Sequence, residues 1–483
     1  MSAEAIGGRG YRAVMADLLL ESWLAQQRGR ITETLFEFLR IPSISADPEH
    51  AGDVRRSAEF VAELLRDAGL EHVKLIETAR GAGLPAVYGD WLHAGEDAPT
   101  VLVYGHHDVQ PVDPLEEWTS GPFEPVIVDG ECRARGAIDD KGQVLYEIEA
   151  ARGLLAERGA LPVNLKFLVE GEEEIGSVHF QQLLLEREEQ LACDVVVVSD
   201  TGMIAPDVPS STVSMRGLVG FDVALRTASI DLHSGMWGGT VPNAARLAAE
   251  LAAALHDGDH RVTIPGFYDQ VRPLSAEEEA SLAAQPFDEQ EFRAQAGHVA
   301  YLEGEAGFSP LARIGVRPTA EVVGINGGYA GPGIKTIVPA TAGLKVALRL
   351  VPDQRPDEIE AAFRAWVQSR LPTGVEAVVT GEGGVAPAVT PVDHPAMRAL
   401  AETIEAVWGK RPLWTREGGS GPEEALGRML IAPVLFLGVG LPDDRIHAPN
   451  ERMVMDQFWK GLLAAAELQE RLGRLRFPKR DDD

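Results

Sequence analysis

The sequence predicts an α/β protein in which a mixed, mostly parallel sheet forms the larger domain and a smaller domain is inserted into it. Between Ile31 and Val198, short β-branched runs alternate with helical patterns, which is typical of a parallel sheet with helices on both faces. After Asp200 the order becomes β-α-β-β-α-β, a ferredoxin-like module, and from His394 the first pattern resumes. We therefore expect the larger domain to comprise residues 1–211 and 391–483, and the inserted domain residues 212–390.

In the larger domain, the apolar runs predict strands that are separated by helices. The predicted strands are residues 100–104, 163–169, 194–198 and 434–438, and the predicted helices are residues 143–157, 396–407 and 455–472. In the first of these helices, one face carries the apolar side chains Leu145, Ile148, Ala151, Leu154 and Leu155. This face is expected to pack against the sheet.

In the inserted domain, we expect four strands and two helices. The predicted strands are residues 212–227, 320–325, 342–351 and 375–380, and the predicted helices are residues 241–256 and 357–371. The Gly-rich stretch 327–333 precedes no convincing helix and is interpreted as a loop. The segment 260–317, with acidic residues at 277–279, is an insertion to which the sequence assigns no role.

Length and composition favour a soluble protein of two domains. A chain of 483 residues exceeds the roughly 250 to 300 residues at which single cores stop growing. Hydrophobic residues at 45% and charged residues at 24% are ordinary, and no stretch approaches the roughly 18 apolar residues of a membrane span. The 44 basic and 74 acidic residues give a formal charge of -30, which would repel nucleic acid and anionic membranes. We expect neither as a partner.

The N-terminal segment and the cysteine content predict a cytoplasmic location. Residues 1–30 mix charged with apolar residues and lack the pattern of a secretory signal. Only Cys132 and Cys193 occur, too few for a disulfide framework or a thiolate metal site. The C-terminal tail, residues 479–483, is expected to be disordered.

Five loops contain histidine or carboxylate side chains, and each has an ordinary explanation when taken alone. His106 follows a predicted strand and could be a surface histidine, while Asp139 and Asp140 could form a helix N-cap. The acidic run 170–177 could be a solvated loop. Asp200 closes a third strand, and the segment 445–451 with His447 follows a fourth.

The joint position of these loops predicts a metal site, because ligands gather outside the carboxyl ends of strands in open α/β sheets. Two histidines and several carboxylates, without cysteine, suit zinc, manganese or cobalt better than calcium. Hydrolysis is the expected chemistry, since a metal-bound water can lose a proton near neutral pH and attack a carbonyl while a free carboxylate carries the proton.

Motifs of other enzyme classes are incomplete or missing. The segment 418–422 contains Ser420 but lacks the last glycine of a nucleophile elbow, and no phosphate-binding loop ends in Gly-Lys-Ser/Thr. A serine hydrolase is therefore not expected.

Four motifs occur in one fixed order and carry a resemblance to a known family. They are Gly-His-x-Asp-Val at 105–109, Asp-Asp-Lys-Gly at 139–142, Glu-Gly-x-Glu-Glu-x-Gly-Ser at 170–177 and His-x-Pro-Asn-Glu at 447–451. From about Ile31 to Leu472, the chain resembles the metallopeptidase family of carnosinase-type dipeptidases, carboxypeptidase G, acetylornithine deacetylase and succinyl-diaminopimelate desuccinylase.

The resemblance implies a role for each residue of a dinuclear site with two divalent ions per chain. By this likeness His106 and Asp200 bind one metal, Glu174 and His447 bind the other, and Asp139 bridges both. Glu173 would be the general base, and Asp108 would support His106. The resemblance also implies a cis peptide bond between Asp139 and Asp140.

The resemblance further implies that the inserted domain is a lid that carries the contact of a homodimer. His233 would reach the active site of the neighbouring subunit and polarise the scissile carbonyl; outside this family context it would be an ordinary turn histidine. Arg349 would bind the C-terminal carboxylate of the substrate with help from Ser420, and would otherwise be a surface residue. Asn243 and Thr336 are further candidates for substrate contact.

The closest likeness is to the dipeptidase branch of this family. It rests on residues 231–235, 335–339, 348–352 and 416–420. One departure argues against carnosine as the substrate, since Glu382 stands where carnosinase-like members carry a histidine.

We expect a cytoplasmic, dimeric dipeptidase with zinc, or else manganese or cobalt, that acts on a small peptide. An N-acyl-amino-acid deacylase with the same metal site is the alternative, and a non-catalytic binding platform is a remote one. The sequence leaves the side-chain preference and the biological role open.

Overall fold

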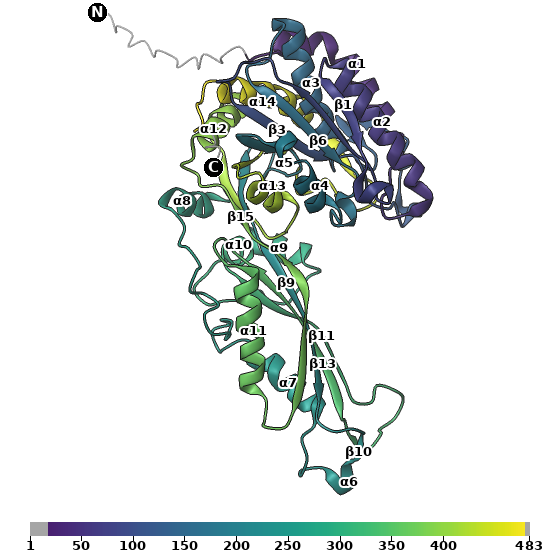
Figure 1. The fold of residues 1–483 in the computed structure, drawn as a ribbon, viewed down its shortest axis with the longest axis vertical. Coiled ribbons are helices and arrows are strands. Elements are labelled where there is room, and N and C mark those ends of the chain that lie inside the picture. The colour runs from purple at the N-terminus through teal and green to yellow at the C-terminus, as the bar shows by residue number, and fades with distance from the viewer. Residues whose placement is uncertain (1–17, 479–483) are drawn as a thin grey trace, which may run out of the picture.

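The computed structural model describes residues 18–478, and its two bodies are arranged one above the other (Figure 1). The upper body contains helices from both the beginning and the end of the chain, whereas the lower body is elongated and is built from the middle. The expected disordered tail at 479–483 lies outside the described residues. Among residues 18–478, no helix combines the length and the apolar character that crossing a membrane requires.

A six-stranded mixed sheet forms the centre of the upper body. Its order is β1 (Glu71–Ile76), β2 (Ala86–Trp91), β6 (Asn164–Glu170), β3 (Thr100–His106), β7 (Val195–Val198) and β17 (Val434–Phe436). The pairs β6–β3, β3–β7 and β7–β17 are parallel, while β1 and β2 join as an antiparallel edge. The predicted α/β fold and its mostly parallel sheet are thus confirmed.

Helices cover both faces of this sheet, as the sequence predicts. One face packs against α1 (Glu21–Leu39), α2 (Ala51–Asp67), α3 (Lys141–Arg158), α12 (Pro395–Trp408) and α14 (Met455–Leu472). The other packs against α4 (Phe180–Glu186), α5 (Glu188–Leu191) and α13 (Glu423–Met429). Successive residues of β3 alternate between the two cores, with Val101 and Val103 in one and Leu102 and Tyr104 in the other.

Helix α3 is more deeply buried than one apolar face predicts. It contacts the sheet together with α1 and α14, so that its polar residues Gln143, Glu147 and Glu149 are also buried. The helical period identified the face toward the sheet but gave no sign of the neighbours on the other sides.

The lower body is a four-stranded antiparallel sheet with two helices on one face. The sheet order is β11 (Thr319–Gly327), β13 (Thr341–Leu350), β9 (Gly217–Arg226) and β14 (Glu376–Val385), and the helices are α7 (Ala244–Ala254) and α11 (Pro356–Arg370). This is the predicted β-α-β-β-α-β module, and its core is separate from those of the upper body. We propose that the two bodies are domains that divide near residues 211 and 391.

The single strand predicted at residues 212–227 is wrong, because the chain changes sheets at Arg216. Residues Ser210–Met215 form β8, which pairs with β15 (Ala388–Val389) and β16 (Leu413–Glu417), while β9 begins at Gly217. A Cβ atom at position 217 would lie 2.5 Å from the carbonyl oxygen of Val385, so glycine allows the close approach. Apolar patterning does not reveal such a crossing point between sheets.

The insertion at 260–317 contacts both bodies. It contains α8 (Ala276–Ala284), α9 (Glu289–Gln295) and α10 (Pro310–Gly315), and α8 and α10 pack against β16. The Trp414 indole donates a hydrogen bond to Glu277 at 3.0 Å, and Arg416 forms an ion pair with Glu278. These contacts hold the insertion against β16.

Candidate metal centre

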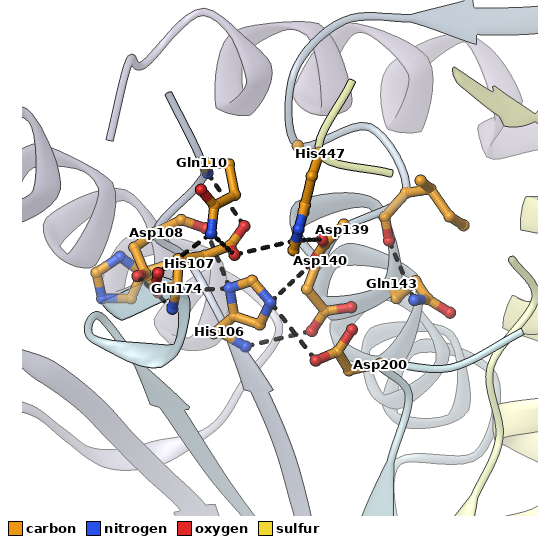
Figure 2. A network of polar contacts seen from close by, with 12 residues as sticks. His106, His107, Asp108, Gln110, Asp139, Asp140, Gln143, Glu174, Asp200 and His447 are labelled. Carbon is orange, nitrogen blue, oxygen red and sulfur yellow. Dashed lines mark hydrogen bonds and ion pairs between the residues drawn. The ribbon is translucent and has the colours of Figure 1, made fainter. Parts of the chain in front are cut away.

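The proposed metal ligands come together at the carboxyl ends of the parallel strands (Figure 2). His106 ends β3, Glu174 lies just after β6, Asp200 follows β7, and His447 lies in the loop after β17. Asp139 differs from the expectation, because its loop follows β5 (Glu131–Arg133) of a separate three-stranded sheet with β4 (Val126–Val128) and β18 (Arg452–Val454). That loop nevertheless passes between the other ligands.

Two groups of three side chains share Asp139. In the first, His106 Nε2 lies 3.0 Å from Asp139 Oδ1 and 3.6 Å from Asp200 Oδ2. In the second, His447 Nε2 lies 2.9 Å from Asp139 Oδ2 and 3.2 Å from Glu174 Oε2. The donor atoms within each group all lie within 4.8 Å of one another. These are the two groups that the sequence analysis assigns to two metals.

The charges in this cluster fit a pair of divalent cations. Burial raises the pKa of Asp200 well above its usual value, and the neighbouring carboxylate of Asp140 adds to this. Hydrogen bonds to Asp139 and Glu174 raise the pKa of His447 to about 10, so that in a metal-free chain a proton balances the carboxylates. Imidazole and carboxylate donors are the set that zinc, manganese and cobalt accept, and these ions would supply the missing positive charge.

Asp108 connects the two groups. The ring nitrogen Nδ1 of His106 donates to the backbone carbonyl of Asp108 at 3.0 Å and lies 3.4 Å from the carboxylate oxygen Oδ1. This arrangement leaves Nε2 free to face Asp139 and Asp200. The other oxygen, Oδ2, accepts the backbone N–H of Glu174 at 3.1 Å. Asp108 thus orients one residue of each group, which extends the supporting role expected from the sequence.

Asp140 supports the site in a way that the N-cap explanation misses. It occupies the N-cap position of α3 but makes no capping hydrogen bond. Its carboxylate instead accepts the backbone N–H of His106 at 3.2 Å. The peptide bond between Asp139 and Asp140 is cis, as the family resemblance implies.

The acidic run after β6 is not a solvated loop. Glu170 and Glu172 are buried, and Glu172 accepts a hydrogen bond from the backbone N–H of Leu84 at 2.8 Å. Glu174 accepts hydrogen bonds from the backbone and the side chain of Gln110 at 3.1 and 2.8 Å. These contacts hold the loop against the end of β3.

Glu173 differs from its acidic neighbours because no described side chain donates a hydrogen bond to its carboxylate. Burial raises the pKa of Glu173 to about 7, and the adjacent carboxylate of Glu174 contributes, although the charge of His106 opposes it. A carboxylate with a pKa near neutrality can accept a proton and release it again. It is therefore suited to general acid and base catalysis.

Glu451 lies beside the proposed ligands, and the sequence analysis gave it no role. Its buried carboxylate accepts the backbone N–H groups of Gly136, Ile138 and Asp139 at 3.0, 3.0 and 3.2 Å, and pairs with Arg135 at 2.7 Å. It thereby holds the loop that presents Asp139. The only signal in the sequence was its place at the end of the motif 447–451.

Arg349 and Ser420 meet where the two bodies join. Arg349, on β13, donates a hydrogen bond from Nη1 to Oγ of Ser420 at 3.0 Å, and Ser420 donates to the carbonyl oxygen of Arg216 at 2.5 Å. A cavity of about 720 Å³ adjoins Arg349 and Arg216. Glu382, the residue that departs from the carnosinase pattern, is exposed on β14.

The other candidate residues of the lid lie far from the metal centre of their own chain. His233 ends β10 (Leu232–His233) and directly precedes α6 (Ser234–Trp237), at the end of the smaller body farthest from the larger one (Figure 1). Thr336 is beside it, since its carbonyl accepts the backbone N–H of Ser234 at 2.9 Å. Asn243 caps α7, because its side-chain oxygen accepts a hydrogen bond from the backbone N–H of Arg246. The structure does not bring these three residues to the site.

Comparison with known proteins places the chain among metallopeptidases. The model of the family described as Peptidase family M20/M25/M40 matches residues 102–471. Beta-Ala-His dipeptidase of Homo sapiens is 29% identical over 435 residues, which cover 87% of this chain and 86% of that protein. Cys-Gly metallodipeptidase DUG1 of Candida albicans is 30% identical over 470 residues, with coverage of 91% and 93%.

A solved structure resembles the chain over nearly its whole length. The M20 family metallo-carboxypeptidase Sso-CP2 from Sulfolobus solfataricus matches with a TM-score of 0.78 and 31% identity, covering 92% of this chain and 99% of that one. The arrangement of both bodies is thus one that an M20 enzyme adopts.

Proposed function

Because the chain belongs to peptidase family M20/M25/M40, we propose that it is a dinuclear metallodipeptidase that hydrolyses the amide bond of dipeptides. The observation that carries this proposal is the pair of three-residue groups sharing Asp139, with the free carboxylate of Glu173 beside them. Relatives named as dipeptidases across about nine-tenths of the chain support the substrate class.

In the proposed mechanism, His106, Asp139 and Asp200 would hold one divalent ion, and Asp139, Glu174 and His447 would hold the other. The bound ions would acidify a water and polarise the scissile carbonyl. Glu173 accepts the proton of the attacking water and delivers it to the leaving amine. Its pKa near 7 supports both transfers.

Arg349 is the proposed partner of the substrate's C-terminal carboxylate. Its guanidinium already hydrogen-bonds Ser420, and a planar fork is suited to a carboxylate. Asn243 and Thr336 are proposed to assist from the lid of a second subunit, because neither lies near the site of its own chain.

We propose a homodimer formed through the lid. Strand β11 is an edge strand whose Val322, Val323 and Ile325 are exposed, and the tip of the lid exposes Met236 and Ile334 at 73% and 95%. A second copy covering these residues would bring its His233 toward the partner's metal centre, which the distance of His233 from its own site supports. We also propose zinc as the physiological metal and the cytoplasm as the location.

Hydrolysis assays test the substrate class. The zinc-loaded enzyme is incubated with free dipeptides, N-acetyl and N-succinyl amino acids, and tripeptides. Cleavage of dipeptides with far higher kcat/KM than the other two classes is the expected result. Preference for the acylated amino acids would assign the chain as a deacylase, and no turnover with two metals bound would favour the binding platform.

A further inference from the structure

A second feature of the site is an apolar cavity beside the metal centre. It measures about 470 Å³ and is bordered by Asp139 and Asp200. This volume lies in the range of small-molecule sites. Most of its lining is apolar and includes Met203, Ile204 and Met215. It can therefore accept an apolar group next to the scissile bond.

One carboxylate in the same lining, that of Glu417, has no cationic partner in the described part of the chain. Glu417 ends β16, and its Oε1 accepts only a long hydrogen bond of 3.3 Å from the hydroxyl of Thr212. No lysine, arginine or histidine among residues 18–478 forms an ion pair with it. The nearby arginines are engaged elsewhere, since Arg416 pairs with Glu278 and Arg216 donates to the carbonyl oxygen of Gly418.

An unpaired carboxylate in an apolar wall costs free energy unless a ligand supplies the positive charge. Burial raises the pKa of Glu417, because no nearby positive charge stabilises the ionised carboxylate.

A dipeptide carries one cation, its α-ammonium group, and that group lies on the side of the scissile bond opposite to the C-terminal carboxylate. The loop after β16 also carries Ser420, which binds Arg349, so one short segment borders both regions.

We propose that Glu417 binds the α-ammonium group of the substrate's N-terminal residue, whose apolar side chain packs against Met203, Ile204 and Met215. This inference rests on the proposed function, because it places the scissile carbonyl at Asp139 and Asp200. It also gives Glu417 the role of limiting substrate length. In a tripeptide, a neutral amide replaces the ammonium group at this position and leaves the half-buried carboxylate without a partner.

The test measures binding without turnover. Zinc-loaded Glu173→Ala protein and the double variant Glu173→Ala/Glu417→Gln are titrated by calorimetry with Leu-Ala and with its desamino analogue, 4-methylpentanoyl-alanine. We expect Glu417→Gln to weaken Leu-Ala binding by about 10- to 100-fold, the cost of losing a charged hydrogen bond, and to change binding of the analogue by less than about twofold. Glu424→Gln, in which a buried carboxylate paired with Arg428 is changed, should alter neither.

Equal weakening of both ligands, or unchanged binding of Leu-Ala, would overturn the assignment of Glu417. Assays in the Glu173 background separate this outcome from failure of the proposed function. If Glu417→Gln selectively weakens Leu-Ala but the wild type hydrolyses no dipeptide, the ammonium site stands and the proposed reaction falls. As a second measurement, kcat/KM is determined for Leu-Ala and Ala-Leu-Ala. Glu417→Gln in the active enzyme should lower the ratio of kcat/KM for Leu-Ala to that for Ala-Leu-Ala. An unchanged ratio would contradict the role of Glu417 in limiting substrate length.

Discussion

The carboxylate of Glu451 accepts the backbone N–H of Asp139 at 3.2 Å, across 312 positions of sequence. Two further N–H groups of the same loop and the guanidinium of Arg135 complete its hydrogen bonds. Glu451 is not one of the proposed metal ligands. It acts by fixing the residue that both proposed metals would share.

We expect Glu451→Gln to weaken zinc binding by about 10- to 100-fold, the usual cost of losing a residue that orients a metal ligand. An amide would place an NH₂ group against backbone N–H donors that need acceptors. Competition with a chromogenic chelator measures the affinity. Glu131→Gln, in the adjacent three-stranded sheet, is the control and should bind zinc as the wild type does. Equal zinc affinities of the wild type and both variants would show that Glu451 does not support the metal site.

The site could be predicted from the sequence where apolar strands lead directly to polar residues. His106 and Asp200 each follow a β-branched run, so their meeting at one edge of the sheet follows from strand order alone. Glu451 could not be predicted in this way, because its partners are backbone groups of a distant loop. The place expected for Asp139 was wrong, because its loop follows a strand of another sheet, and only its motif identified it.

Arg349→Ala is expected to raise KM for Leu-Ala by about 10- to 100-fold, because the C-terminal carboxylate loses a charged, two-pronged partner. Steady-state kinetics with Leu-Ala and Leu-Ala amide, which lacks the carboxylate, measure the effect. The variant should scarcely change the kinetics of the amide. An unchanged KM for Leu-Ala would show that Arg349 does not bind the carboxylate.

Mixing two inactive variants tests the proposed exchange of His233 between subunits. Glu173→Ala and His233→Ala chains each lack one group, but a mixed dimer contains one complete site. After random exchange, about a quarter of the wild-type activity per chain is expected, since half of the dimers carry one working site of two. Activity that stays at the level of the separate variants, in dimers shown to have exchanged, would place His233 outside the partner's site.

Glu147 is expected to make stability depend on pH. Burial raises its pKa from 4.5 to about 7, against the hydrogen bond from Ser199. The neutral form is therefore favoured in the folded chain, so its stabilising contribution is present below pH 4.5 and is lost as the pH rises through 7. Relative to Glu147→Gln, the wild type should lose up to about 3 kcal/mol between these limits.

Thermal melting of both proteins at pH 5 and pH 8 measures this difference. The melting temperature of the wild type should fall relative to that of Glu147→Gln as the pH rises. A constant difference across the range would mean that Glu147 has the same pKa in the folded and unfolded chains.

In the fold, too, elements with a regular local pattern could be predicted, whereas elements held by distant residues could not. Helices α12 and α14 lie within one residue of their predicted bounds because their apolar period is regular and each packs against the sheet side of the core. The insertion at 260–317 was not interpretable, since its short helices are held by distant partners such as Arg416 and Trp414. Sequence periodicity reports which face is buried, but it does not report which distant segment buries it.

The central claim, a dinuclear site with Glu173 as the general base, is tested most directly by zinc titration of the metal-free enzyme with dipeptide hydrolysis as the readout. Activity should appear as zinc binds and reach its maximum at two ions per chain. Glu173→Ala should bind the same two ions but hydrolyse the dipeptide about 10²- to 10⁴-fold more slowly. Full activity without metal, or wild-type activity in the zinc-loaded Glu173→Ala enzyme, would contradict the account.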